Sequence, residues 1–137
     1  MAVQNKTTLK GYFEDGDQPT GSNFTDLVDS LQHVSSDTLQ TLTDGSTISW
    51  DLSVGGLAAV TLGGNRTLAN PSNLAAGIYM LKVIQDGTGT RSLAYGTIYK
   101  FAGGVVPVLS STAGAYDIIT FFCDGTNMNG IPNYNFS

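Results

Sequence analysis

The residue types that could perform chemistry are few in this chain. His33 is the only histidine and Cys123 the only cysteine, and neither is matched with the base, nucleophile or carboxylate pair that a hydrolase needs. Cys123 ends the apolar run Ile118–Cys123, which is typical of a buried, inert thiol. His33 falls on a short predicted helix, where we expect a surface or interface histidine. The sequence therefore predicts no catalytic residue, no cofactor and no enzymatic activity.

Two loops, Asp86–Thr90 and Asp124–Asn127, are rich in oxygen ligands of the kind that calcium favours. Each offers a single carboxylate, whereas a calcium loop needs several at fixed spacing. Asp and Asn also hydrogen-bond their own backbone in turns, so we expect plain hairpin turns and no metal. Gly63-Gly64-Asn65, before Arg66, lacks the Lys-Ser/Thr ending and the following helix of a phosphate loop.

Aromatic side chains could stack on sugars, because their faces pack against the apolar faces of sugar rings. The sequence does not show that they converge, so two interpretations stay open: packing in the core and between subunits, or an exposed patch that meets a glycan or another protein. Tyr12, Phe13 and Tyr134 are our candidates for surface contacts. The aromatic residues weighed for a sugar platform are Trp50, Tyr79, Tyr95, Tyr99, Tyr116 and Tyr134.

Composition limits the class of protein. The 137 residues fit one ordinary core, and 17 glycines with only 12% charged residues favour short strands and tight turns. A formal net charge of −5 leaves no basic stripe for nucleic acid. No apolar run approaches the roughly 20 residues that span a membrane, and we expect no secretory signal and synthesis in a reducing cytoplasm.

The N-terminal part, residues 1–36, is predicted to be an extended arm followed by one short helix. From Ser22, the predicted cap, apolar residues recur at helical spacing. Such a short helix is marginal alone and must pack on something. It docks either on its own β-domain or in a three-helix contact on a symmetry axis, because the spacing also approximates a heptad. The apolar positions are Phe24, Leu27, Val28, Leu31 and Val34.

Residues 37–137 read as a mainly β domain, an antiparallel β-sandwich or jelly-roll. Thr38–Thr43 and Thr47–Ser53 flank Asp44-Gly45, which predicts a hairpin. The tail Gly130–Ser137 is expected to lie over a neighbouring surface instead of continuing the sheet. Further predicted strands are Leu57–Leu62, Arg66–Ala69, Ile78–Gln85, Arg91–Ala94, Ile98–Phe101, Val105–Leu109 and Ile118–Cys123.

Several short motifs mark the β region. They are Gly64-Asn65-Arg66-Thr67-Leu68, Lys100–Gly104 with Pro107, Ala113-Gly114-Ala115-Tyr116-Asp117, and Asp124-Gly125-Thr126-Asn127. Together they resemble the recurring β-domain of bacteriophage tail fibres and related virion appendages. The segment Leu9–Ser30 independently resembles the N-terminal part of phage fibre and virion-protein modules. Where that β-domain commonly has an aromatic after its Asp-Gly-Thr-Asn turn, this chain has Met128.

The resemblance implies a homotrimeric, non-enzymatic virion protein that assembles in the bacterial cytoplasm. Residues 1–36 would attach it to other virion proteins of the capsid or tail, and residues 37–137 would project as a fibre head or knob. The apolar helix positions and Arg66 become candidates for the trimer or anchor interface, and Arg66 should pair with a carboxylate or carbonyl within or between subunits. A head fibre, capsid decoration protein or accessory appendage is favoured. A receptor-binding tail fibre and a carbohydrate-binding module that contacts host-surface glycans are the alternatives.

Overall fold

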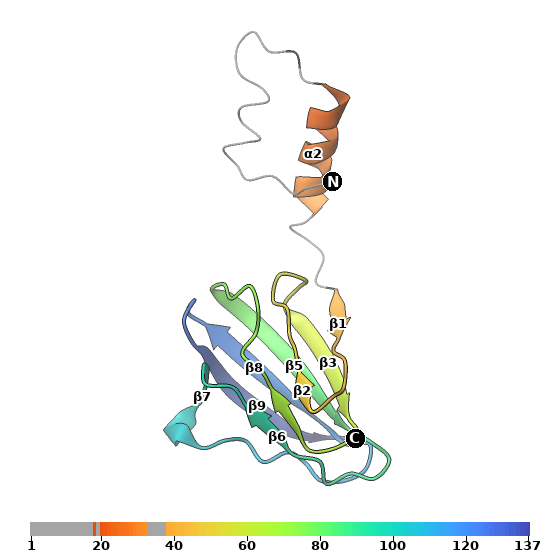
Figure 1. Ribbon diagram of the computed structural model, residues 1–137, viewed down its shortest axis with the longest axis vertical. Coiled ribbons are helices and arrows are strands. Elements are labelled where there is room, and N and C mark those ends of the chain that lie inside the picture. The colour runs from red at the N-terminus through yellow and green to blue at the C-terminus, as the bar shows by residue number, and fades with distance from the viewer. Residues whose placement is uncertain (1–17, 19, 33–37) are drawn as a thin grey trace. The chain divides into compact units, whose positions relative to one another are not determined.

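The computed structural model describes residue 18, residues 20–32 and residues 38–137 (Figure 1). The chain divides into two compact units, Met1–Ser36 and Asp37–Ser137. Tyr12, Phe13, His33 and Val34 lie outside the described residues. The attachment role predicted for the first unit and the knob role predicted for the second stay predictions.

Helix α2, Gly21–Gln32, is the described element of the first unit. Its cap is Thr20, two residues before the Ser22 that the sequence favours. The Asn23 amide donates to Thr20 Oγ1 at 3.3 Å, and the Thr20 amide donates to Asn23 Oδ1 at 2.7 Å. This reciprocal pair satisfies two backbone donors at the helix start. Ser22 cannot serve as the cap because it already lies inside the helix.

The second unit contains a six-stranded sheet whose order is β1-β3-β5-β8-β9-β7. Neighbours β1 with β3, β3 with β5, and β7 with β9 run parallel. Only β5 with β8 and β8 with β9 are antiparallel. The strands are β1 (Leu39–Thr41), β3 (Leu57–Leu62), β5 (Gly77–Gln85), β7 (Tyr99–Phe101), β8 (Tyr116–Cys123) and β9 (Met128–Phe136).

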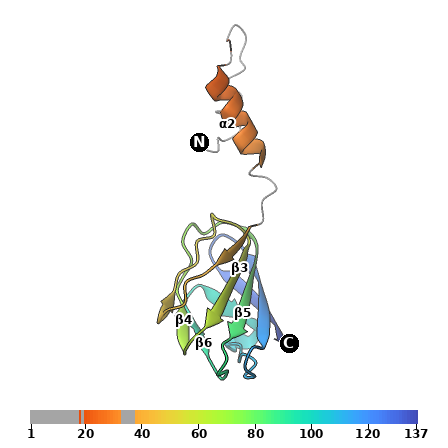
Figure 2. The same cartoon turned by 90° about the vertical axis from the view of Figure 1, so that its right-hand side faces the viewer.

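A smaller sheet, β2-β4-β6, is parallel throughout. Its strands are β2 (Thr47–Ile48), β4 (Arg66–Leu68) and β6 (Leu93–Tyr95). The chain passes from the large sheet to the small one three times, from β1 to β2, from β3 to β4 and from β5 to β6. We call each such passage a coil, and the three successive coils stack in parallel. Figure 2 shows β3 and β5 in one layer and β4 and β6 in the other.

This winding corrects two predictions. The second unit is mainly β and consistent with a sandwich, but its large sheet is mixed and its small sheet is parallel, so neither sheet is antiparallel throughout. The turn at Asp44-Gly45 makes no hairpin, because β1 and β2 belong to different sheets and each pairs with a strand of the next coil. The Gly63–Asn65 turn likewise joins the two sheets. A tight turn followed by an alternating strand is compatible with a hairpin and with a crossing between two sheets. The local sequence therefore does not distinguish the two.

The core lies between the two sheets. Trp50 is 1% exposed, with its ring 6.2 Å from that of Tyr79 and 6.0 Å from that of Phe121. Edge-to-face packing of this kind adds to the large apolar area that aromatic residues bury. The buried set from both sheets includes Ile48, Leu68 and Leu93 of the small sheet and Val60, Leu81, Val83, Ile119 and Phe121 of the large sheet.

Two predicted segments near the C-terminus differ in the structure. Val105–Leu109 forms no strand: it follows the 3-10 turn Ala102–Gly104 and runs without sheet pairing. Gly130–Ser137, predicted to leave the sheet, lies mostly within β9 and pairs with β8. Pro132 is compatible with this position because proline is accepted at sheet edges, and beyond Gly130 strand β9 forms the edge.

Candidate functional site

The predicted interface residues of the helix are only partly described. Phe24 and Val28, one turn apart on α2, are 52% and 50% exposed, and Leu27 is half-buried. Leu31 lies in the helical backbone, and Val34 lies beyond the described part. The role of these residues in a trimer or an anchor therefore stays a prediction.

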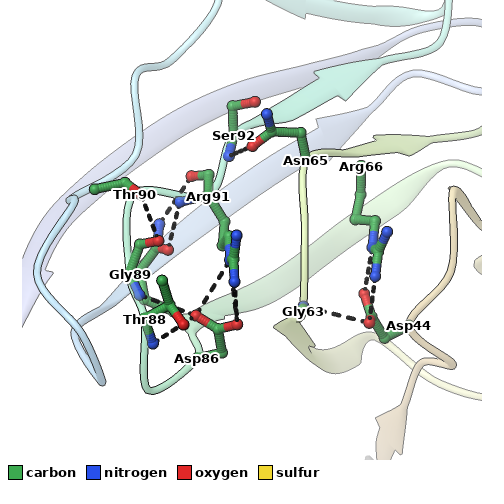
Figure 3. Close-up of polar contacts among 11 residues, drawn as sticks. Asp44, Gly63, Asn65, Arg66, Asp86, Thr88, Gly89, Thr90, Arg91 and Ser92 are labelled. Atoms are coloured by element: carbon green, nitrogen blue, oxygen red, sulfur yellow. Dashed lines mark hydrogen bonds and ion pairs between the residues drawn. The ribbon is translucent and has the colours of Figure 1, made fainter.

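Arg66 pairs with a carboxylate, as the sequence predicts, and the partner is in the same chain. Its Nε lies 2.8 Å from Asp44 Oδ1 and its Nη2 lies 2.9 Å from Asp44 Oδ2, while the Gly63 amide donates to Oδ2 at 3.3 Å (Figure 3). The hydrogen bond from Arg66 lowers the pKa of Asp44. The sequence singled out Asp44 only as a turn residue, so its pairing with Arg66 was missed.

Further polar contacts connect the next coil at the same end of the sandwich. The Ser92 amide donates to Asn65 Oδ1 at 3.0 Å, and Arg91 Nη2 donates to Asp86 Oδ2 at 2.8 Å (Figure 3). Asp86 Oδ1 also accepts from the amides of Thr88 and Gly89. The hydrogen bond from Arg91 lowers the pKa of Asp86 to about 2. Protein donors thus engage this carboxylate, which favours a turn over a calcium ligand. The hairpin expected at Asp86–Thr90 is wrong, however, because this turn leads from β5 of the large sheet to β6 of the small sheet.

Asp117 is a buried carboxylate that holds two segments together. It is 1% exposed and accepts from the Ser110 amide at 2.7 Å, the Ser110 hydroxyl at 2.7 Å and the Asn135 amide at 2.8 Å. Buried charges need such donors. Asp117 therefore fastens the segment before β8 and the end of β9 to the sheet.

Cys123 and the turn Asp124–Asn127, which were also considered for chemistry, occupy positions that are explained by the fold. Cys123 is 1% exposed, which confirms the prediction of a buried thiol. The turn Asp124–Asn127 joins antiparallel β8 and β9, which confirms the hairpin expected there. Within the described residues, no three His, Cys, Asp or Glu side chains are grouped to hold a metal ion, and no helix is long and apolar enough to cross a membrane.

The predicted aromatic set does not form one platform. Trp50, Tyr79 and Tyr99 are buried in the core. The Tyr116 ring stacks on Phe136 at a centroid distance of 5.3 Å. Tyr134, 46% exposed, remains a candidate surface residue. Tyr95 is partly buried and packs against the core, with its ring 4.8 Å from that of Phe101. Core packing thus accounts for four of the six aromatic residues that were weighed for sugar binding.

The outer face of the six-stranded sheet, facing away from the core, gathers exposed apolar side chains. Strand register places Leu39, Leu57, Met80, Thr120 and Ile131 side by side in one row across five strands. Six exposed apolar residues mark this outer face: Leu39 (56%), Ile78 (59%), Met80 (36%), Phe122 (58%), Ile131 (66%) and Phe136 (38%). Sequence reasoning missed this face because a short apolar run does not show which of its residues point away from the core.

Charge is sparse on the outer face. Among the outward residues of the paired strands in the described part, two are charged: Lys82 on β5 and Lys100, which is in register with Asn129 at the β7 edge. Lys82 Nζ lies 3.8 Å from the centre of the Tyr116 ring, where the ring quadrupole stabilises a cation, and Lys100 Nζ donates to the Thr97 carbonyl oxygen at 2.8 Å. Both ammonium groups therefore have an attractive partner within the chain, and the other outward residues are apolar or uncharged.

An apolar groove of about 490 Å³ lies beside β9. It is lined by Phe101, Val105, Val106, Val108, Ile131 and Tyr134, among others. Ile131 belongs to both the groove and the outer face, so the two apolar surfaces are continuous. Sugar sites need several convergent polar groups beside an aromatic ring, and this lining is dominated by aliphatic side chains.

No family model, curated protein or solved structure matches this chain. Within residues 38–137, fold and surface together define a β-sandwich with exposed apolar residues on the outer face of its large sheet. Its function has to be inferred from that face and from the sequence motifs.

Proposed function

We propose that the chain is a non-enzymatic structural protein of a bacteriophage virion. It forms a homotrimer that serves as a head fibre, capsid decoration protein or accessory appendage. The unit Met1–Ser36 anchors it to another virion protein, and the unit Asp37–Ser137 is displayed on the particle. The motif resemblance supports the virion assignment, and the apolar outer face supports assembly with other copies.

The outer face is the observation that carries this proposal. The exposed parts of its six apolar residues amount to roughly 600 Å², at the upper limit for soluble monomers, whose patches of that size often mark interfaces. A standard interface buries about 800 Å² per partner, so half-buried neighbours such as Leu57 and Ile118 would complete it. Copies of one chain are the simplest partner, because a largely apolar face with few charges is complementary to itself.

A reconstruction of the phage particle that encodes the chain tests the function. We expect density for the second unit, three-fold symmetric, at a site on the capsid or an appendage. Particles without this density, together with chain recovered only in the soluble fraction of the lysate, would contradict the virion assignment.

A glycan array separates the carbohydrate-binding alternative. The structural role predicts no reproducible binding by the wild-type protein. Specific glycan binding that Tyr134→Ala abolishes, with the melting temperature retained, would instead favour a receptor-binding fibre or carbohydrate-binding module.

A further inference from the structure

The six-stranded sheet has two open edges. Strand β1 forms one edge, and on the other side β7 covers β9 only as far as Gly130. In residues 38–137 no strand pairs with the second side of β1 or with β9 beyond Gly130. Open edges expose unpaired backbone donors and acceptors, which are templates for another strand. Figure 1 shows β1 and β9 toward opposite sides of the sheet.

Strands β1 and β9, at the two open edges, run in the same direction, and the same rows of paired residues reach both of them. Strand β1 is parallel to β3 and β5, while β8 is antiparallel to both β5 and β9, so β1 and β9 point the same way. The row across the outer face begins with Leu39 on β1 and ends with Ile131 on β9. The next row begins with Thr41 and ends with Asn133.

We propose that neighbouring copies join edge to edge, with β1 of one copy adding in parallel to β9 of the next. This inference rests on the trimer in the proposed function and names where its subunits meet. Three such contacts close a ring, because a head-to-tail interface under three-fold rotation returns to the first copy. Closure turns the three outer faces inward and pairs β1 and the exposed part of β9 in every copy, while the short strand β7 keeps its outer side.

Symmetry also fixes the register of the added strand. The three-fold rotation that relates the copies involves no shift along its axis. If the strands run along this axis, each residue of β1 therefore meets the β9 residue of the same row in the next copy. Leu39 of one copy then lies beside Ile131 of the next, where the apolar groove adjoins β9. Thr41 lies beside Asn133. Both are exposed and lie on the outer face, so their side chains face the same side of the joined sheets.

Cysteine cross-linking tests this pairing. Neighbouring strands lie about 4.8 Å apart, a spacing that a disulfide can bridge. The variant carrying Thr41→Cys and Asn133→Cys is oxidised as an assembled protein and separated under denaturing, non-reducing conditions. We expect most of the monomer band to be replaced by a covalent trimer. Cys123 is retained because it is buried.

A matched control places the second cysteine four residues away on the same strand. Thr41→Cys with Asn129→Cys separates the thiols by about 13 Å along the strand, so no cross-link should form. Each single variant should also stay monomeric on the denaturing gel. Covalent dimers from either single variant would show that like edges pair with each other, which overturns the ring.

Hydrogen exchange provides a second measurement without added cysteines. Backbone amides within residues 39–41, 131 and 133–136 that do not already bond to β3 or β8 should exchange at least tenfold more slowly in the wild-type assembly than in an outer-face variant that is monomeric. A wild-type protein that is itself a monomer contradicts the proposed function. A stable wild-type trimer with neither the cross-link nor this protection contradicts the edge pairing alone.

Discussion

Asp44 and Arg66, 22 residues apart in the sequence, form a two-bond ion pair with distances of 2.8 and 2.9 Å. The pair joins the turn after β1 to the turn after β3, and so connects the first coil of the sandwich with the second. Arg66, the arginine of the Gly-Gly-Asn-Arg-Thr segment, therefore has a structural role: its ion pair holds the turn after β1 against the turn after β3.

A double-mutant cycle tests whether this pair is coupled. Arg66→Ala and Asp44→Ala should each lower the melting temperature by a few degrees, and the double variant should lose little more than either one. Thermal unfolding of the three variants and the wild type measures the coupling. Strictly additive losses would show that the two charges act separately. Light scattering of Arg66→Ala, followed on dilution, tests its predicted contribution to the trimer.

Acid sensitivity should follow from Asp86, whose folded-state pKa is lowered to about 2 from an ordinary value of 3.8. A lowered pKa means that the folded protein holds the charged form, so this contribution is complete above about pH 5 and is lost as the pH falls toward 2. Asp86→Asn should flatten the stability profile in that window and leave its shape near neutral pH unchanged. An unchanged acid profile in this variant would contradict the assignment.

The buried carboxylate of Asp117 should be the most costly acid to remove. Asp117→Ala leaves the amides of Ser110 and Asn135 without an acceptor, and we expect a loss of about 3 kcal/mol in unfolding free energy. Denaturant unfolding of Asp117→Ala and of the near-isosteric Asp117→Asn measures it, with Asp124→Asn in an exposed turn as control. Equal stability of Asp117→Ala and the wild type would show that Asp117 does not hold these two segments to the sheet.

Much of the strand content could be predicted from local patterns. Leu57–Leu62 was predicted with the bounds that β3 has, and Ile78–Gln85 matches β5 to within one residue. These segments are short, nearly continuous apolar runs bounded by glycine-rich or polar turns, which is a strand signal that is visible without tertiary information. Val105–Leu109 shows the limit of such patterns, because an apolar run with Pro107 predicts a strand where the chain only crosses the surface.

Strand pairing and the outer face could not be predicted. A turn such as Asp44-Gly45 is compatible with a hairpin and with a crossing between sheets, and the choice depends on distant partners such as Arg66. Likewise, the outward residues of β5 and β8 form a continuous apolar surface only after the register places Ile78 opposite Phe122. Both features arise from pairing between segments far apart in the sequence.

Removing Met1–Ser36 tests the division of labour between the two units. Asp37–Ser137 contains the whole buried core of the β-sandwich, so it should remain folded with an unchanged melting temperature. It should no longer decorate particles, since the predicted anchor is gone. Quantitative blotting of purified particles measures its occupancy. Wild-type occupancy of the shortened protein would place the anchor in the β-sandwich instead.

The most direct test of the account is the mass in solution of an outer-face variant. Phe122→Lys and Ile78→Lys each place a charge at an exposed position of the apolar outer face, and Val54→Lys is the control at a loop position that is 49% exposed. Light scattering over a dilution series should give a trimer for the wild type and Val54→Lys. It should give a folded monomer of about 14.4 kDa for the two sheet variants. A monomeric wild type, or trimers of all four proteins with equal resistance to dilution, would contradict assembly through this face.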